Sequence, residues 1–274
     1  MRTDDEPTRR RRVALVLIAV WLSVAVCAGW ATWRNNGPAP YASPTRGGAG
    51  STKRVILVRH GEKARRSDNY GLSAAGYLRA ALFPLFFNLT TATQFNDRAL
   101  GAIYAKRSDS VSPSTRPIET MVPLAIDRSL DISDHFAVTE GAALMRRILL
   151  GTAADDDRIA LICWEHRAIP SMLSGVGATT VVSWSTDPTA PSMEDDLFDV
   201  AWIVDFVPSA AAPSVSATLV GSATLTVLRT FGVDPAVTSM SQVHDELARA
   251  VATRQLAGTD PVPLAQLSFE FRVA

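Results

Sequence analysis

The sequence predicts an α/β fold, a three-layer α/β/α sandwich with a mostly parallel central sheet, preceded by one N-terminal transmembrane helix. Short apolar runs rich in Val and Ile alternate with segments of helical periodicity, as in α/β proteins. A chain of 274 residues, 47% of them hydrophobic, is long enough to bury one sizeable core. The transmembrane helix is predicted by an uncharged apolar stretch, residues 13–33.

This N-terminal stretch indicates a signal anchor. Residues 1–12 are polar and end in four arginines, and residues 13–33 would span a hydrocarbon core of ~30 Å at ~1.5 Å per residue. The arginines favour a cytoplasmic tail at 1–12, and a body anchored in the cell membrane that lies outside the cytoplasm. A cleaved secretory signal, a lipoprotein signal ending at Cys27 and a twin-arginine signal are alternatives. Residues 34–52, which have no periodicity, predict a flexible linker, and 53–274 the folded domain.

Three apolar runs predict buried strands that deliver polar residues to one edge of the sheet. The first, Val55–Val58, leads into Arg59-His60-Gly61, and the second is Ala99–Ala105. The third, Ile159–Trp164, leads into Glu165-His166-Arg167. Ligands of open α/β sheets bind beyond the carboxyl ends of the strands, so these residues are candidates for a site. Later strands are expected at residues 201–206, 216–228 and 267–273.

Helix start signals follow the first two strands. Ser73 is a plausible N-cap, and Pro84 a kink, in a helix followed by a loop at residues 88–98. Ser114 or Thr115 is expected to cap a second helix with Pro117 in its first turn, which puts Arg116 at the helix N-terminus. Free N–H groups and the helix dipole favour anions there. Residues 128–137 predict a polar connection, and further helices are expected at residues 141–150, 170–173 and 239–256.

The composition argues against several classes of function. Lys plus Arg and Asp plus Glu both total 27, so the net charge gives no sign of nucleic-acid binding. Two cysteines exclude a disulfide framework and a cysteine-based zinc site. A Walker-type phosphate loop and a nucleophile elbow are both missing from the sequence. These features give no sign of a cofactor.

Two strand ends that each present a histidine, together with an arginine at a helix start, point to phosphoryl chemistry. The guanidinium groups of Arg59 and Arg116 can each bind phosphoryl oxygens in a bidentate manner. An imidazole such as that of His60 or His166 can act as nucleophile or as hydrogen-bond donor.

Four segments in order carry a resemblance to a known family. They are Val58–Lys63 (VRHGEK), Gly71–Gly76 (GLSAAG), Ser114–Thr120 (STRPIET) and Ile162–His166 (ICWEH). Together they resemble the histidine phosphatase superfamily, which has the phosphoglycerate mutase-like fold, over roughly residues 53–206.

The resemblance implies a role for each matched residue. His60 would attack phosphorus and form a phosphohistidine, while Arg59, Arg116 and His166 would hold the phosphoryl oxygens and stabilise the transition state. No metal is required, because the cationic pocket neutralises the charge. Arg107, in the loop before the arginine helix, is a secondary candidate for substrate binding.

The general acid that protonates the leaving alcohol is less well defined. Where one branch of the family has an acidic residue after the second histidine, this sequence has Arg167, which would narrow the pocket or add a cation. The other branch has a Glu between the arginine helix and the last catalytic strand, and Glu140 is the candidate by position. Glu165 and Glu62 are rivals, and a site without an acid is a further alternative.

The resulting hypothesis is a membrane-anchored, extracytoplasmic phosphatase that acts on a phosphorylated small molecule or a phosphoprotein. A phosphomutase is one alternative, although the export signal argues against a glycolytic mutase, whose substrates are cytosolic. A catalytically weak or inactive phosphate-binding domain of the same fold is the other.

Overall fold

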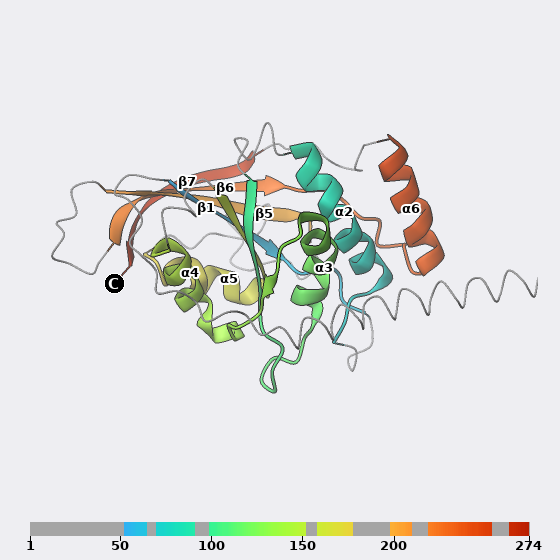
Figure 1. Cartoon of the computed structure of the whole chain (residues 1–274), viewed down its shortest axis with the longest axis horizontal. Coiled ribbons are helices and arrows are strands. Elements are labelled where there is room, and N and C mark those ends of the chain that lie inside the picture. The colour runs from blue at the N-terminus through green and yellow to red at the C-terminus, as the bar shows by residue number, and fades with distance from the viewer. Residues whose placement is uncertain are drawn as a thin grey trace, which may run out of the picture. The chain divides into compact units, whose positions relative to one another are not determined.

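Seven strands form one mixed sheet in the computed structural model, in the order β3-β2-β4-β1-β5-β6-β7 (Figure 1). The structure describes residues 52–64, 70–90, 99–151, 158–177, 198–209, 219–253 and 263–273. The neighbouring strands β3, β2, β4 and β1 are parallel to one another; they span Ile132–Ser133, Ala99–Ala105, Arg158–Trp164 and Lys53–Arg59. The antiparallel strands β5, β6 and β7 span Val200–Pro208, Leu219–Arg229 and Pro263–Val273.

The α/β class is confirmed, but the expectation of a mostly parallel sheet holds for only half of it. Three strand pairings are parallel, and the three that involve β5, β6 and β7 are antiparallel. The apolar runs of the sequence reveal strands but not their direction. The connection between β5 and β6, residues 209–218, is too short for the crossover that a parallel pair requires.

Strand β1 is buried on both faces and separates two layers of helices, so the three-layer arrangement is confirmed. Val55 and Leu57 pack with α4 (Gly141–Leu149) and α5 (Ile169–Ser174). Ile56 and Val58 point to the other face, where they pack in one cluster with residues of α2, α3 and α6. These helices span Ala74–Thr90, Arg116–Arg128 and Met240–Thr253 (Figure 1).

The helix starts agree with the sequence signals. The hydroxyl of Ser73 accepts a hydrogen bond from the Gly76 N–H at 3.1 Å, which makes Ser73 the N-cap of α2. This helix continues through Pro84 to Thr90, so the loop expected from residue 88 starts later. Helix α3 begins at Arg116, as predicted, with Thr115 at the capping position.

Some elements gave no clear sequence signal. Strand β3 has only two residues and lies in the stretch predicted as a polar connection. One-turn 3₁₀ helices, Val138–Glu140 and His166–Ala168, precede α4 and α5. In the part of the chain that the structure describes, no helix is long and apolar enough to cross a membrane. The predicted span at residues 13–33 lies outside that part.

Candidate active site

The ends of β2, β4 and β1 bring the candidate residues to one edge of the sheet. The register pairs Ala105 with Cys163 and Arg59 with Trp164, so the next residue of each strand continues at this edge. The backbone N–H of His60 donates to the Trp164 carbonyl at 3.3 Å, and that of Lys106 to the Cys163 carbonyl at 3.3 Å. Residues distant in the sequence therefore meet where ligands of α/β sheets bind.

His60 has a fixed ring orientation. Only 3% of its surface is exposed, and Nδ1 lies 2.8 Å from the Gly61 carbonyl oxygen. A carbonyl oxygen can only accept a hydrogen bond, so this contact requires the proton on Nδ1. In the neutral ring the lone pair is then on Nε2, the nitrogen available for attack on an electrophile.

The surroundings of His60 also keep it neutral. Burial lowers its pKa from the ordinary 6.5 to about 3; the bond to Gly61 opposes this shift, and the charges of Arg116, Arg59 and His166 add to it. At pH 7 the ring is therefore an uncharged base. The charges of Arg59, Arg116 and His166 therefore act on the His60 ring.

The two arginines are held by different contacts. Arg59 is buried, and its guanidinium lies 3.9 Å from the centre of the Phe198 ring, which in turn lies 6.4 Å from the His60 ring. Arg116 donates from Nε to the Ser114 hydroxyl at 2.9 Å. Burial lowers the pKa of Arg116, and the nearby carboxylate of Glu165 opposes that shift.

Residues of α3 tie this helix to the loop after β1. The Thr120 hydroxyl accepts from the Gly61 N–H at 2.9 Å and donates to the Arg116 carbonyl at 2.7 Å. The close approach of α2 to this loop explains Gly76, since a Cβ there would lie 2.4 Å from the Glu62 carbonyl oxygen.

Glu140 and Arg107 contact each other and the loop before α4. The Glu140 carboxylate is half exposed, accepts from the Ala137 N–H at 2.7 Å, and lies 4.0 Å from Arg107. Arg107 donates to the His135 carbonyl at 3.1 Å. None of these contacts joins Glu140 to His60, and its role as general acid stays a prediction.

Glu62 is held by a buried arginine. Arg79 approaches both carboxylate oxygens, with a shortest distance of 2.6 Å, and donates from Nη1 to the Phe231 carbonyl at 2.8 Å. This fork geometry uses both oxygens of Glu62.

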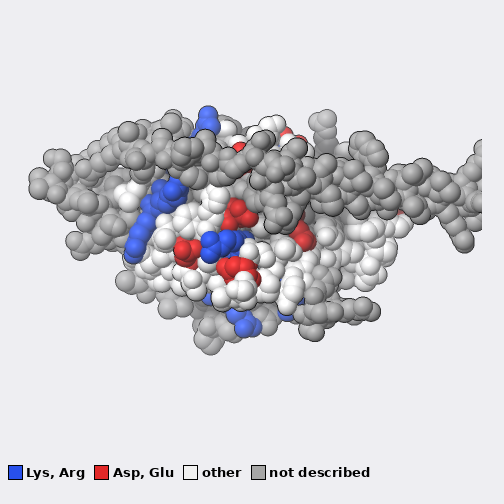
Figure 2. All heavy atoms as spheres, turned by 60° about the horizontal axis from the view of Figure 1, so that its bottom comes forward, with Lys and Arg blue, Asp and Glu red and all other residues white. Residues whose placement is uncertain are grey.

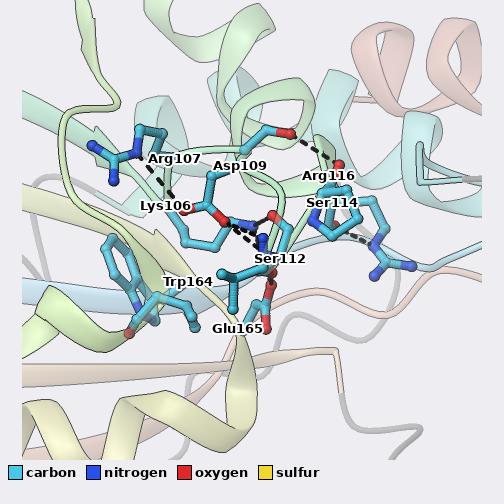
Figure 3. Close-up of polar contacts among 12 residues, drawn as sticks. Lys106, Arg107, Asp109, Ser112, Ser114, Arg116, Trp164 and Glu165 are labelled. Carbon is cyan, nitrogen blue, oxygen red and sulfur yellow. Dashed lines mark hydrogen bonds and ion pairs between the residues drawn. The ribbon is translucent and has the colours of Figure 1, made fainter.

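Lys106 is a functional candidate that the sequence reasoning missed. It is fully buried, and its Nζ donates to the Ser112 hydroxyl at 2.7 Å and lies 3.3 Å from Glu165 Oε1. The Ser112 hydroxyl in turn donates to the same carboxylate oxygen, and Figure 3 shows the three side chains pointing toward one another. The available signal was a cation directly after the apolar run Ala99–Ala105, at the carboxyl end of a strand.

A cleft of about 910 Å³ opens beside the site and shares Phe198 with it. Apolar residues of its wall include Leu72, Val233 and Val237, and its charged residues are Glu62, Lys63, Arg79 and Asp199. On the face in Figure 2, basic and acidic side chains are interspersed. Among the described residues, no three His, Cys, Asp or Glu side chains cluster in a way that could hold a metal.

Comparisons with known proteins were made at the level of sequence and of structure. No family model and no curated protein matches this sequence. A putative phosphohistidine phosphatase SixA from Nakamurella multipartitia aligns with a TM-score of 0.37 and 13% identity, over 60% of this chain and 87% of that one. A phosphoglycerate mutase from Plasmodium falciparum gives 0.38 and 15%, over 69% and 93%. A mycobacterial glucosyl-3-phosphoglycerate phosphatase gives 0.35 and 14%, over 57% and 90%.

These structures are named as phosphatases and a mutase, which agrees with the resemblance seen in the sequence but does not establish it. With TM-scores of 0.38 or less and identities of 15% or less, they assign neither activity nor substrate to this chain. The functional assignment rests on the chain's own residues.

Proposed function

We propose that the chain is a phosphatase that hydrolyses phosphomonoesters through a phosphohistidine at His60. The observation that carries this proposal is a buried His60 whose Nδ1 bonds to the Gly61 carbonyl, and whose ring is kept neutral by burial and by the charges of Arg59, Arg116 and His166. A neutral imidazole is a nucleophile, and the surrounding cations would attract a phosphoryl group.

In the first step, Nε2 of His60 would form a bond to phosphorus as the bond from phosphorus to the ester oxygen breaks. Charge on the equatorial oxygens would be stabilised by Arg59, Arg116 and His166. In the second step, water would attack phosphorus, the Nε2–P bond would break, and orthophosphate would leave. The alcohol part of the ester could occupy the cleft beside Phe198.

The leaving alkoxide takes up a proton in the first step, and three carboxyl groups compete as its source. Glu62 is engaged by Arg79, and Glu140 accepts the Ala137 N–H. Glu165 is the one whose charge acts on Arg116. These contacts do not single out one of the three as the donor.

A phosphate-binding domain with little activity is the second candidate. It is favoured by a specific observation: the carboxylates of Glu62, Glu140 and Glu165 each accept a hydrogen bond. Each carboxylate is therefore already engaged as a hydrogen-bond acceptor, and none is free to act only as a proton donor.

The proposal includes a membrane anchor at residues 13–33, with the domain outside the cytoplasm, based on the apolar stretch and the arginines before it. It predicts that the chain stays in the membrane fraction after alkaline carbonate extraction. In intact cells, protease added outside should digest the domain. Release by carbonate, or protection from the protease, would contradict it.

The activity is tested on the full chain with p-nitrophenyl phosphate as substrate. His60→Asn should lower kcat about 10³-fold or more, whereas His244→Asn, on an exposed part of α6, should retain wild-type turnover. An alkaline quench of the wild type with ³²P-labelled ester should trap label on His60. Equal turnover by wild type and His60→Asn between pH 4 and pH 8 would rule the proposal out.

A further inference from the structure

We propose that Lys106 is a positioning residue that holds the Glu165 carboxylate away from Arg116, and thereby leaves the Arg116 guanidinium available for the phosphoryl group. This inference rests on the proposed function, because it assigns Arg116 to substrate binding. The group formed by Lys106, Ser112 and Glu165 is called the Lys106 network below.

Burial of Lys106 is the first step of the argument. Lysine is seldom fully buried, because removing its ammonium from water is costly unless the charge is paired. Here Nζ has three acceptors, which are the Ser112 carbonyl, the Ser112 hydroxyl and Glu165 Oε1. These three acceptors compensate the burial of the Lys106 ammonium, which therefore has a defined position at the edge of the site.

The network joins the two segments that present the proposed phosphate ligands. Ser112 belongs to the loop that leads to Ser114, whose hydroxyl accepts from Arg116 Nε. Glu165 directly precedes His166 at the end of β4. Lys106, at the end of β2, lies between these segments, as Figure 3 shows for its contacts with Ser112 and Glu165.

The charges explain why the position of Glu165 matters. Its negative charge acts on the Arg116 guanidinium and opposes the lowering of that group's pKa by burial. A guanidinium binds a carboxylate and a phosphate with the same fork of donors, so a mobile Glu165 would compete with substrate for Arg116. Lys106 and Ser112 both bind Glu165 Oε1 and oppose that movement.

The test measures KM for p-nitrophenyl phosphate and the inhibition constant of orthophosphate in the full chain. In Lys106→Met, both constants should rise about tenfold, because Glu165 then occupies Arg116. In the double variant Lys106→Met/Glu165→Gln, both should return to within about threefold of wild type, since a neutral amide competes weakly. The control Arg249→Met breaks an exposed ion pair on α6 and should leave both constants unchanged.

A purely structural role for Lys106 predicts a different pattern. Loss of folded protein would lower the apparent kcat but would leave KM and the inhibition constant at wild-type values, and the double variant would not recover. Unchanged constants in Lys106→Met, or a double variant that does not recover, would overturn the inference. If Lys106→Met does not fold, Ser112→Ala removes the other hold on Glu165 and should raise both constants severalfold, an effect that Glu165→Gln should reverse.

Orthophosphate binding separates this inference from the proposed function. If the wild type does not hydrolyse the ester, the proposed function fails, and calorimetry with orthophosphate still tests the network. A Kd about tenfold weaker in Lys106→Met, restored in the double variant, supports the inference. Equal Kd values in all variants, or no binding by the wild type, overturn it.

Discussion

Two cation–carboxylate pairs lie next to the strand ends of the site, Arg79 with Glu62 and Lys106 with Glu165, and they are built differently. Arg79 reaches both oxygens of Glu62 and makes a further bond to the Phe231 carbonyl; the two side chains are 3% and 17% exposed. Lys106 reaches a single oxygen of Glu165, and these side chains are 0% and 28% exposed. A fork fixes both oxygens of the Glu62 carboxylate, whereas Lys106 and Ser112 together hold Glu165 at one oxygen, Oε1.

The two pairs therefore have different roles. The Arg79 pair supports the fold, and the Lys106 pair organises the candidate site. The Arg79 pair joins the loop after β1 to α2 and to the segment after β6, so it holds three parts of the chain together. The Lys106 pair joins residues that flank Arg116 and His166. We therefore expect losses at Arg79 to reduce stability, and losses at Lys106 to weaken phosphate binding.

Replacing Arg79 should give the largest loss of stability among the tests of this contrast. Arg79→Met leaves the Glu62 carboxylate without its cation in a largely buried position, which should lower the free energy of unfolding by about 3–5 kcal/mol. Urea denaturation of the full chain in detergent would measure it. Lys106→Met should cost less than half as much, because Glu165 keeps partial access to water. Equal losses in the two variants would show that the pairs do not differ in this way.

Thr120 links the loop after β1 to α3, and its removal should have an intermediate effect. In Thr120→Val the Gly61 N–H loses its acceptor in a buried position, which should cost about 1–3 kcal/mol of unfolding free energy. Thr120→Ser keeps the hydroxyl and serves as the matched control in the same denaturation experiment. If Val and Ser variants are equally stable, the hydroxyl does not support this link.

The smallest effect concerns His60, which directly follows β1. Its folded pKa, about 3, lies below the ordinary 6.5, so between these values the unfolded chain binds a proton that the native protein does not. Unfolding free energy should therefore fall as the pH is lowered from 6.5 toward 3, by about 1 kcal/mol from this group between pH 6 and pH 5.

His60→Asn should remove that part of the slope, and His244→Asn should not. Urea denaturation at pH 6 and at pH 5 measures it in each variant. A slope in His60→Asn as steep as that of wild type would mean that His60 is not held neutral by its surroundings.

Strand and helix positions around the site were readable from the sequence because they rest on local signals. Apolar runs marked β1, β2 and β4, and Ser73 and Pro117 marked helix starts. The position of a polar residue at the end of a buried strand then placed His60 at the site edge.

Other features depend on contacts between distant segments and could not be read in this way. Lys106 and Glu165 lie 59 positions apart in the sequence, and the register of β2 with β4 brings them together. Glu140 was chosen by its position between two motifs, and sequence position does not show that its carboxylate accepts the Ala137 N–H. The antiparallel direction of β5, β6 and β7 is likewise set by how the strands pair in the sheet, and local apolar runs do not show it.

The bond between His60 and Gly61 has a consequence for mutational robustness. The acceptor is a main-chain carbonyl, which every amino acid supplies, so no substitution at position 61 can delete it. What a substitution can change is the space, since a Cβ at this position would lie 3.0 Å from the Gly76 carbonyl oxygen. The backbone thus sets the proton on Nδ1 and the lone pair on Nε2, and glycine at this position gives clearance from α2.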